Sequence, residues 1–319
     1  MKFDRLARSL LVISVLLGCS GNDSGDDGAQ VAWVPAGGAN AGGPGDLAGS
    51  AACQRVDLVI AVDASTSMAE ELQAMRTTVF PAFAERLKAV GAGLDDFRVA
   101  TLDGCPQPAS YHSRGSNSEC NFESSSPWIE SSSSHMTDEF SCVGDLYLAD
   151  QECSGNNDDE QPASAVAAAL EEPMLSGPNS GFRRNDALLI VIAITDEDEQ
   201  PTGAERSPEE VYNRLVETVD DDPRRMVFVG AGGSRSCQGV YGEAEPANRL
   251  QSITELFGRH NRGVFWDLCE GRLEDGLEEA FKVIESACTE LCGLDEDCGG
   301  GLNVPFCDEH PEDPSCNLG

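Results

Sequence analysis

The chain has 319 residues, of which 40% are apolar and only 6% are aromatic. We therefore expect a core of aliphatic side chains, as in a sheet covered by helices. Its 56 acidic and 21 basic residues give a formal net charge of −35, which argues against nucleic-acid binding because such a field repels phosphate groups. The 13 cysteines favour an oxidising compartment, and their spacing does not match that of a zinc site.

The N-terminus has the pattern of an export signal. Three basic residues among the first eight precede the apolar run 10–17, which is too short for a permanent membrane helix. The run ends in Leu-Leu-Gly-Cys at Cys19, which resembles the lipobox of bacterial lipoproteins. The resemblance implies that residues 1–18 are removed and that Cys19 carries a lipid. Because the residue after Cys19 is Ser20 and not an aspartate, the resemblance favours the outer membrane over the inner membrane. An ordinary signal peptide is the alternative.

Three further regions follow the predicted signal peptide. Residues 19–52 are rich in glycine, alanine, aspartate and serine and lack periodicity, so we expect a flexible tether with a relaxed span of about 30 Å. Residues 53–288 form the predicted domain, with an insertion at 104–159, and residues 289–319 form a tail. The insertion and the tail each contain four cysteines, which predicts disulfide bonds in both.

Lipidation of Cys19 would leave 12 cysteines, enough for six disulfides, but the sequence does not decide their pairing. The local pairs Cys105–Cys120 and Cys142–Cys153 are one guess.

Apolar runs alternate with amphipathic segments in the predicted domain. We expect strands at residues 56–62, 97–102, 187–195, 226–229 and 264–266. We expect helices at residues 68–90, 208–219, 246–258 and 273–287, and a further helix that starts near residue 163. Pro81 should kink or divide the first of them, and Ser207 is the expected N-cap of the helix at 208–219. This alternation predicts an α/β fold: an open, mostly parallel sheet with helices on both faces. Such sheets bind ligands beyond the carboxyl ends of their strands.

A D-x-S-x-S motif formed by Asp63, Ser65 and Ser67 follows the first predicted strand. Its carboxylate and hydroxyl oxygens are hard donors that suit Mg²⁺, Mn²⁺ or Ca²⁺. The alternative is that these side chains only cap the following helix.

The motif resembles the metal-ion-dependent adhesion site of the von Willebrand factor A (VWA) family. Thr195-Asp196, after the most apolar strand, resembles the second part of that site. The resemblance covers residues 56–287 and implies a Rossmann-like VWA fold that holds a divalent cation, most simply Mg²⁺, at Asp63, Ser65, Ser67 and Asp196. The family commonly adds a threonine from a middle loop.

The middle loop of this chain, residues 156–162, contains no threonine. We expect Glu160 to replace it, with Asp159 as the second choice. An added carboxylate would leave less positive charge on the cation and weaken its attraction for an acidic partner. We interpret the neighbouring Asp198 and Glu199 as charged side chains exposed to solvent. The alternative is that they support the metal ligands.

The resemblance implies a membrane-anchored module that binds a protein partner through an exposed Asp or Glu on the cation. A structural envelope protein, stiffened by the cation, is the alternative. A metal-dependent hydrolase is disfavoured, because the chain has neither G-x-S-x-G nor H-E-x-x-H, so we expect no enzyme activity. The glycines of residues 230–233 follow a strand but lack the lysine of a phosphate-binding loop.

Overall fold

The computed structural model describes residues 55–65, 67–89, 96–105, 109–115, 118–145, 161–199, 207–239 and 242–294. The chain divides into two units, Met1–Gly45 and Asp46–Gly319, and all described residues belong to the second. The predicted signal peptide, Cys19, the tether, Asp159, Glu160 and the tail beyond residue 294 lie outside the described residues.

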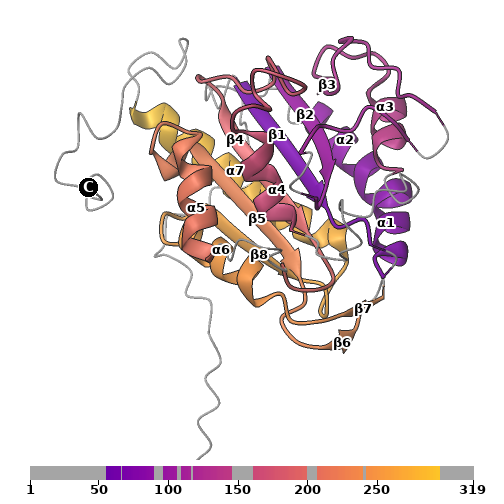
Figure 1. Ribbon diagram of the computed structural model, residues 1–319, viewed down its shortest axis with the longest axis vertical. Helices are drawn as coiled ribbons and strands as arrows, with labels where there is room; N and C mark the ends of the chain where they lie inside the picture. Colours follow the sequence, from indigo (N-terminus) through magenta and orange to yellow (C-terminus); the bar gives the residue numbers. More distant parts are fainter. Residues whose placement is uncertain are drawn as a thin grey trace, which may run out of the picture. The chain divides into compact units, whose positions relative to one another are not determined.

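A six-stranded sheet forms the centre of the second unit (Figure 1). Its strands run in the order β3-β2-β1-β4-β5-β8, and the antiparallel edge strand β3 is the exception to parallel pairing. The bounds of these strands are β1 Arg55–Val62, β2 Asp96–Asp103, β3 Ile129–Glu130, β4 Leu188–Ile194, β5 Met226–Gly232 and β8 Gly263–Asp267. The predicted α/β fold with a mostly parallel sheet is confirmed.

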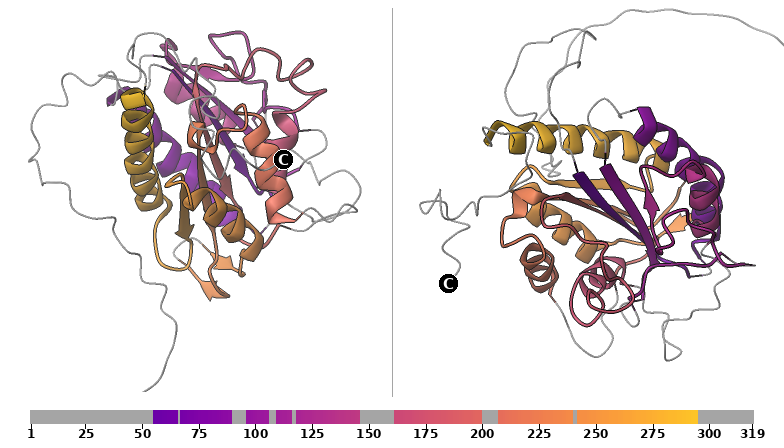
Figure 2. Two further views of the ribbon diagram at one scale, coloured as in Figure 1. Left: turned by 90° about the vertical axis from the view of Figure 1, so that its left-hand side faces the viewer. Right: turned by 90° about the horizontal axis from the view of Figure 1, so that it is seen from above.

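Helices cover both faces of the sheet (Figure 2). Alternate residues of β1 enter opposite cores, with Leu58 and Ile60 in one and Val59 and Ala61 in the other. The first core is covered by α1 Ala69–Ala74, the π-helical η1 Met75–Val79, α2 Phe80–Ala89, α3 Met136–Val143 and α7 Leu273–Leu294. The second is covered by α4 Pro162–Ala169, α5 Pro208–Glu217 and α6 Asn248–Gly258. Ser207 caps α5 by accepting a hydrogen bond from the Glu210 N–H, as predicted.

Two helices differ in detail from the sequence prediction. The segment predicted at 68–90 contains the π-helical turn η1, which ends two residues before Pro81. The Phe80 N–H bonds to the Met75 carbonyl in this wider turn. A π turn here is consistent with the missing N–H of Pro81, which interrupts the regular hydrogen-bond ladder. The last helix extends beyond the predicted end at 287 to Leu294.

The described part of the insertion belongs to the folded unit. It supplies β3 and α3, and its Ile129 and Phe140 are fully buried in the first core. Cys120 bonds to Cys142, so the guessed local pairs Cys105–Cys120 and Cys142–Cys153 are wrong. The bond joins the loop before β3 to α3, a contact set by the fold of the insertion and not by closeness in sequence.

A second disulfide, Cys237–Cys269, joins a small hairpin to the turn after β8. The hairpin consists of β6 Cys237–Gln238 and β7 Glu243–Ala244, between β5 and α6. Cys105 and Cys288 are also disulfide-bonded.

The glycines at the end of β5 allow α6 to pack closely against the sheet. A Cβ at Gly230 would lie 2.5 Å from Thr254 Oγ1, and one at Gly232 would lie 2.7 Å from Ala247 Cβ. Any larger residue would push the helix away, because these distances are shorter than van der Waals contact. Close packing therefore accounts for these two glycines of the glycine-rich segment.

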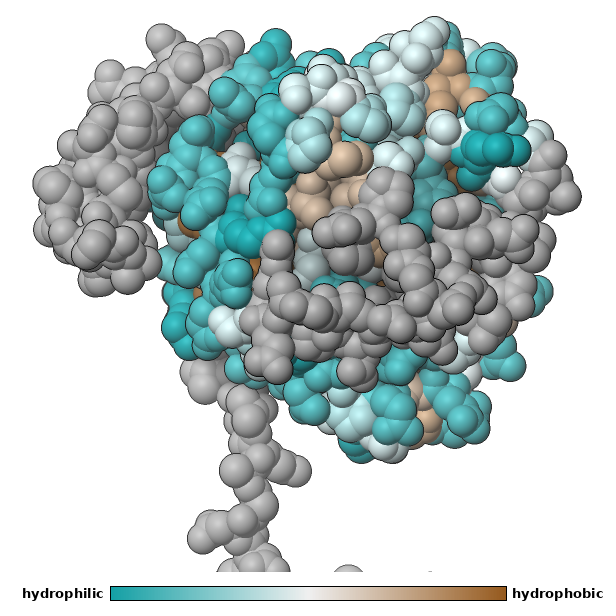
Figure 3. All heavy atoms as spheres, in the orientation of Figure 1, coloured by the Kyte–Doolittle hydropathy of each residue, from teal (hydrophilic) through white to brown (hydrophobic). Residues whose placement is uncertain are grey.

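Polar and charged side chains dominate the face shown in Figure 3, where apolar side chains form small patches. Such a surface agrees with the acid-rich composition. Within the described residues, no helix is both long and apolar enough to span a membrane.

A buried ion-pair network holds the amino end of β1. The Asp57 carboxylate is fully buried and accepts hydrogen bonds from the Arg184 N–H at 2.6 Å and from Arg184 Nε at 2.8 Å. The Arg183 guanidinium lies 3.4 Å from the same carboxylate. These contacts fasten the segment that leads into β4 to the start of β1.

Replacement of Asp57 by alanine should strongly destabilise the domain, because the largely buried guanidinium groups of Arg183 and Arg184 would lose their common counter-charge. We expect a loss of about 3–5 kcal/mol in the free energy of unfolding, measured by urea denaturation. The control is Asp96→Ala, whose side chain is 47% exposed and also contacts Arg184. It should cost less than about 1 kcal/mol. Equal losses in the two variants would contradict the prediction.

Candidate functional site

The candidate site lies where β1 and β4 end side by side. Val62 pairs with Ile194 at the carboxyl end of these parallel strands, and the Asp63 N–H continues the pairing to the Ile194 carbonyl at 2.9 Å. The residues that follow both strands therefore meet at one edge of the sheet. Asp63 and Asp196 are both buried, with 0% and 4% of their surface exposed.

The loop after β1 directs its polar groups toward the loop after β4. Asp63 Oδ1 accepts a hydrogen bond from the Ser65 N–H at 2.8 Å. The hydroxyl oxygens of Ser65 and Ser67 lie 2.8 Å apart, and the Ser67 hydroxyl donates to Asp196 Oδ1 at 3.3 Å. The structure thus brings together four of the residues predicted from the sequence.

The described contacts of these side chains go beyond capping the following helix. The N-cap residue of α1 is Met68, whose side chain makes no capping hydrogen bond. The Ser65 and Ser67 hydroxyls contact each other and Asp196 instead. The capping alternative therefore does not account for the D-x-S-x-S motif.

Thr195 holds the two loops together. Its buried hydroxyl donates to Asp63 Oδ2 at 2.7 Å and accepts a hydrogen bond from the Glu197 N–H at 3.2 Å. Its own N–H bonds to the Ala231 carbonyl on β5 at 3.0 Å. Thr195 thus orients Asp63 and folds the chain into a turn after β4. In the sequence, this residue is marked only as the partner of Asp196 in the T-D pair.

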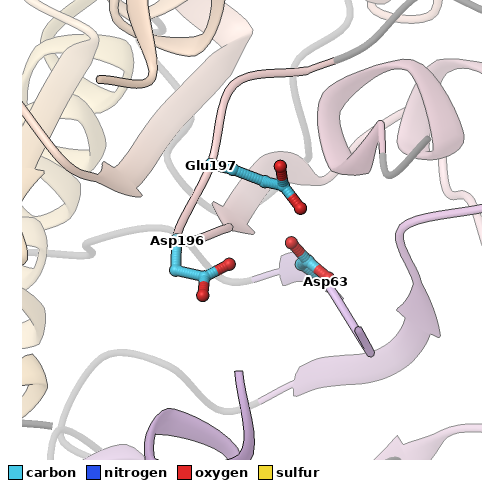
Figure 4. Close-up of side chains that lie close together, drawn as sticks. All are labelled: Asp63, Asp196 and Glu197. Atoms are coloured by element: carbon cyan, nitrogen blue, oxygen red, sulfur yellow. The ribbon is translucent and has the colours of Figure 1, made fainter. Parts of the chain in front are cut away.

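Glu197 is a carboxylate that the sequence analysis missed. One carboxylate oxygen from each of Asp63, Asp196 and Glu197 lies within 4.8 Å of the other two. The three side chains point toward one another from the two loops (Figure 4). The only signal in the sequence was its position next to Asp196, which is weak because consecutive side chains of an extended chain point in opposite directions.

The hairpin β6–β7 and helix α1 place a further acid near this group. The Glu245 N–H bonds to the Asp196 carbonyl at 2.7 Å, and a Cβ at Gly242 would lie 2.9 Å from Glu71 Oε1. Glu71 on α1 is 2% exposed, and its Oε2 has no hydrogen-bond partner among the described residues. Burial, reinforced by the negative charges of Asp196 and Asp63, raises the pKa of Glu71 from 4.5 to about 7.

The interpretation of Asp198 and Glu199 as solvated charge is wrong for Glu199 and incomplete for Asp198. Glu199 is 3% exposed and accepts hydrogen bonds from the Ala163 N–H and the Ser164 hydroxyl in the first turn of α4. The half-buried Asp198 accepts one from the Arg249 N–H in the first turn of α6, at 2.8 Å. Both satisfy helix N–H groups, which favour negative charge. They fix the loop after β4 to two helices.

The donor set suits a hard divalent cation. Carboxylate and hydroxyl oxygens surround the group, as Mg²⁺, Mn²⁺ and Ca²⁺ prefer, and none of the residues placed there is a cysteine or histidine, the usual ligands of zinc. Asp63, Ser65, Ser67 and Asp196 are the residues that would hold such an ion. Where Glu160 and Asp159 would lie relative to it stays a prediction, because both fall outside the described residues.

The stability of the cation-free protein should depend on the protonation of Glu71. Because its pKa is raised in the folded state, its contribution to stability is fully present below pH 4.5 and is lost as the pH rises through about 7. Relative to Glu71→Gln, the wild-type free energy of unfolding should fall by up to about 3 kcal/mol across that range. Urea denaturation in EDTA at pH 5 and pH 8 measures this difference. A difference that does not change with pH would refute the prediction.

Comparisons with known proteins leave the family open. No protein-family model matches the chain, and no curated protein matches it. Among solved structures, it is similar to proximal thread matrix protein 1 from the mussel byssus, with 15% identity over 73% of this chain and 48% of that one, and a TM-score of 0.38. This chain therefore spans about half the length of the mussel protein.

Two other solved structures are similar to this chain with comparable sequence identities and TM-scores. Manganese-loaded TRAP protein of Plasmodium vivax has 14% identity over 74% of each chain and a TM-score of 0.34. The pilus adhesin SpaC of Lactobacillus rhamnosus GG has 13% identity over 74% of this chain and 31% of its own, with a TM-score of 0.37. Such TM-scores are too low to establish a common fold, so the architecture rests on the strand order and register described above.

Proposed function

We propose that the chain is a VWA-type, cation-dependent protein-binding module of the bacterial cell envelope. The observation that carries the proposal is the convergence of Asp63, Ser65, Ser67 and Asp196 at the carboxyl ends of β1 and β4. This is the place where open parallel sheets bind ligands. These residues also match the motif of the metal-ion-dependent adhesion site.

The proposed chemistry follows from charge and coordination. The carboxylates of Asp63 and Asp196 balance the two positive charges of a cation such as Mg²⁺, while the two serine hydroxyls are neutral donors. A cation of this kind prefers more oxygen ligands than these four residues supply. An aspartate or glutamate of a partner protein would provide one. A purely structural role for the cation is the alternative, and it predicts that partner binding is insensitive to chelation.

Loss of either carboxylate should strongly weaken cation binding. We expect Asp63→Asn and Asp196→Asn to weaken binding of Mg²⁺ or Mn²⁺ by on the order of 100-fold, and Ser67→Ala to weaken it less, because a charged ligand contributes more than a neutral one. Isothermal titration calorimetry measures these affinities.

The matched control is Asp267→Asn. Asp267 ends β8 on the same edge of the sheet, but its carboxylate accepts hydrogen bonds from Ser234 and the Cys269 N–H. Its replacement should leave the cation affinity unchanged. If wild type and Asp63→Asn bind the cation equally, the proposed site is wrong.

The envelope location rests on the lipobox-like sequence at Cys19. We expect intact mass spectrometry of the membrane fraction to show a chain that begins at Cys19 and carries lipid, and Cys19→Ser to release the protein from membranes. Membrane retention of the Cys19→Ser variant would contradict the lipid anchor without bearing on the cation site.

A further inference from the structure

We propose that Glu197 is an internal ligand of the cation, which a partner's carboxylate must displace. This inference rests on the proposed function and names the residue that regulates access to the site. It starts from the position of the Glu197 carboxylate within 4.8 Å of those of Asp63 and Asp196. Neither the D-x-S-x-S motif nor the T-D pair includes this residue.

The backbone turn after β4 explains why two consecutive side chains reach one place. In an extended chain, Asp196 and Glu197 would point to opposite sides. Here the Thr195 hydroxyl accepts a hydrogen bond from the Glu197 N–H, which closes a turn of the kind that serine and threonine form with the residue two positions on. Because the same hydroxyl donates to Asp63, the turn is fastened to the opposite loop. Both acids therefore face Asp63 (Figure 4).

The charge balance makes Glu197 a competitor of an acidic partner. With Asp63 and Asp196 alone, a divalent cation leaves the site neutral. With Glu197 as well, three carboxylates surround two positive charges, and the site has a net charge of −1. An approaching carboxylate is then repelled, and it also finds one oxygen position already filled. Removal of Glu197 from the cation relieves both obstacles.

The three acids differ in exposure, and this difference identifies Glu197 as the ligand that a partner's carboxylate can replace. Asp63 and Asp196 are buried, with 0% and 4% of their surface exposed, whereas Glu197 is half-buried. Glutamate also has one more rotatable bond than aspartate, so its carboxylate can leave the site while the backbone turn stays in place. The two aspartates form the fixed part of the site and Glu197 its exchangeable part.

The internal ligand also changes the preferred cation. Ca²⁺ accommodates many oxygen ligands, several carboxylates among them, whereas Mg²⁺ keeps several waters and binds few carboxylates. The state with Glu197 bound therefore favours Ca²⁺, and the state open to a partner favours Mg²⁺ or Mn²⁺. A change of cation would shift the protein between the two states.

Water-proton relaxation of the Mn²⁺-loaded protein tests the proposal, because the relaxation rate rises with the number of waters on the bound ion. Glu197→Ala should bind Mn²⁺ more weakly, by on the order of tenfold, and should show a higher relaxation rate per bound ion. Added acetate should then lower that rate at smaller concentrations in Glu197→Ala than in the wild type. The charge-matched control, Glu243→Ala, removes an exposed acid of the hairpin and should behave like the wild type.

The outcomes separate this inference from the proposed function. If Asp63→Asn abolishes Mn²⁺ binding while Glu197→Ala keeps the wild-type affinity and relaxation rate, Glu197 is not a ligand and the cation site stands. If the wild type and Asp63→Asn bind Mn²⁺ equally, the cation site itself is refuted, and the internal ligand with it. A change in Glu243→Ala as large as in Glu197→Ala would assign the effect to net charge and overturn the specific role of Glu197.

Discussion

The pairing of β1 with β4 is the constraint on which the candidate site depends. These two strands are adjacent in the sheet although more than a hundred residues separate them in the chain, and they end in register at Val62 and Ile194. A shift of one residue would move Asp63 away from Thr195 and turn alternate side chains to the wrong face. The register is held at the other end of β1 by Asp57 and Arg184, which join the same two segments through buried charge.

Five of the six strands of the sheet and most helices could be predicted because their signals are local, whereas β3 and α3 of the insertion were not predicted. The apolar run of β4 and the alternating cores on either side of β1 follow from hydrophobic periodicity, and the N-cap at Ser207 follows from residue type. Features that depend on distant contacts could not be predicted. The Cys120–Cys142 and Cys237–Cys269 bonds, and the ion pairs of Asp57, join segments whose proximity exists only in the folded chain.

The same distinction applies to the candidate site. Asp63, Ser65, Ser67 and Asp196 could be found because a short motif and a strand end mark them. No sequence motif distinguishes Glu71 from other acidic residues of an amphipathic helix. Only the fold shows that it is buried against Gly242. Glu197 was missed for a related reason. Its direction depends on a hydrogen bond to the Thr195 hydroxyl, and such a turn is not visible in residue types alone.

The acidic run after β4 shows how one loop can combine binding and positioning. Asp196 and Glu197 face Asp63, whereas Asp198 and Glu199 face the first turns of α6 and α4. The N–H groups of the two helices favour the ionised forms of Asp198 and Glu199, but burial outweighs them and raises both pKa values, that of Glu199 to about 7. The Glu199 contact has a further consequence, because Ala163 lies in the first turn of α4, the helix that follows the loop predicted to supply Glu160. The Gln161 N–H is bonded to the Gly104 carbonyl at 2.7 Å, so two contacts fix the start of α4. Glu199, two residues after Glu197, thus fastens the loop after β4 to the first turn of α4.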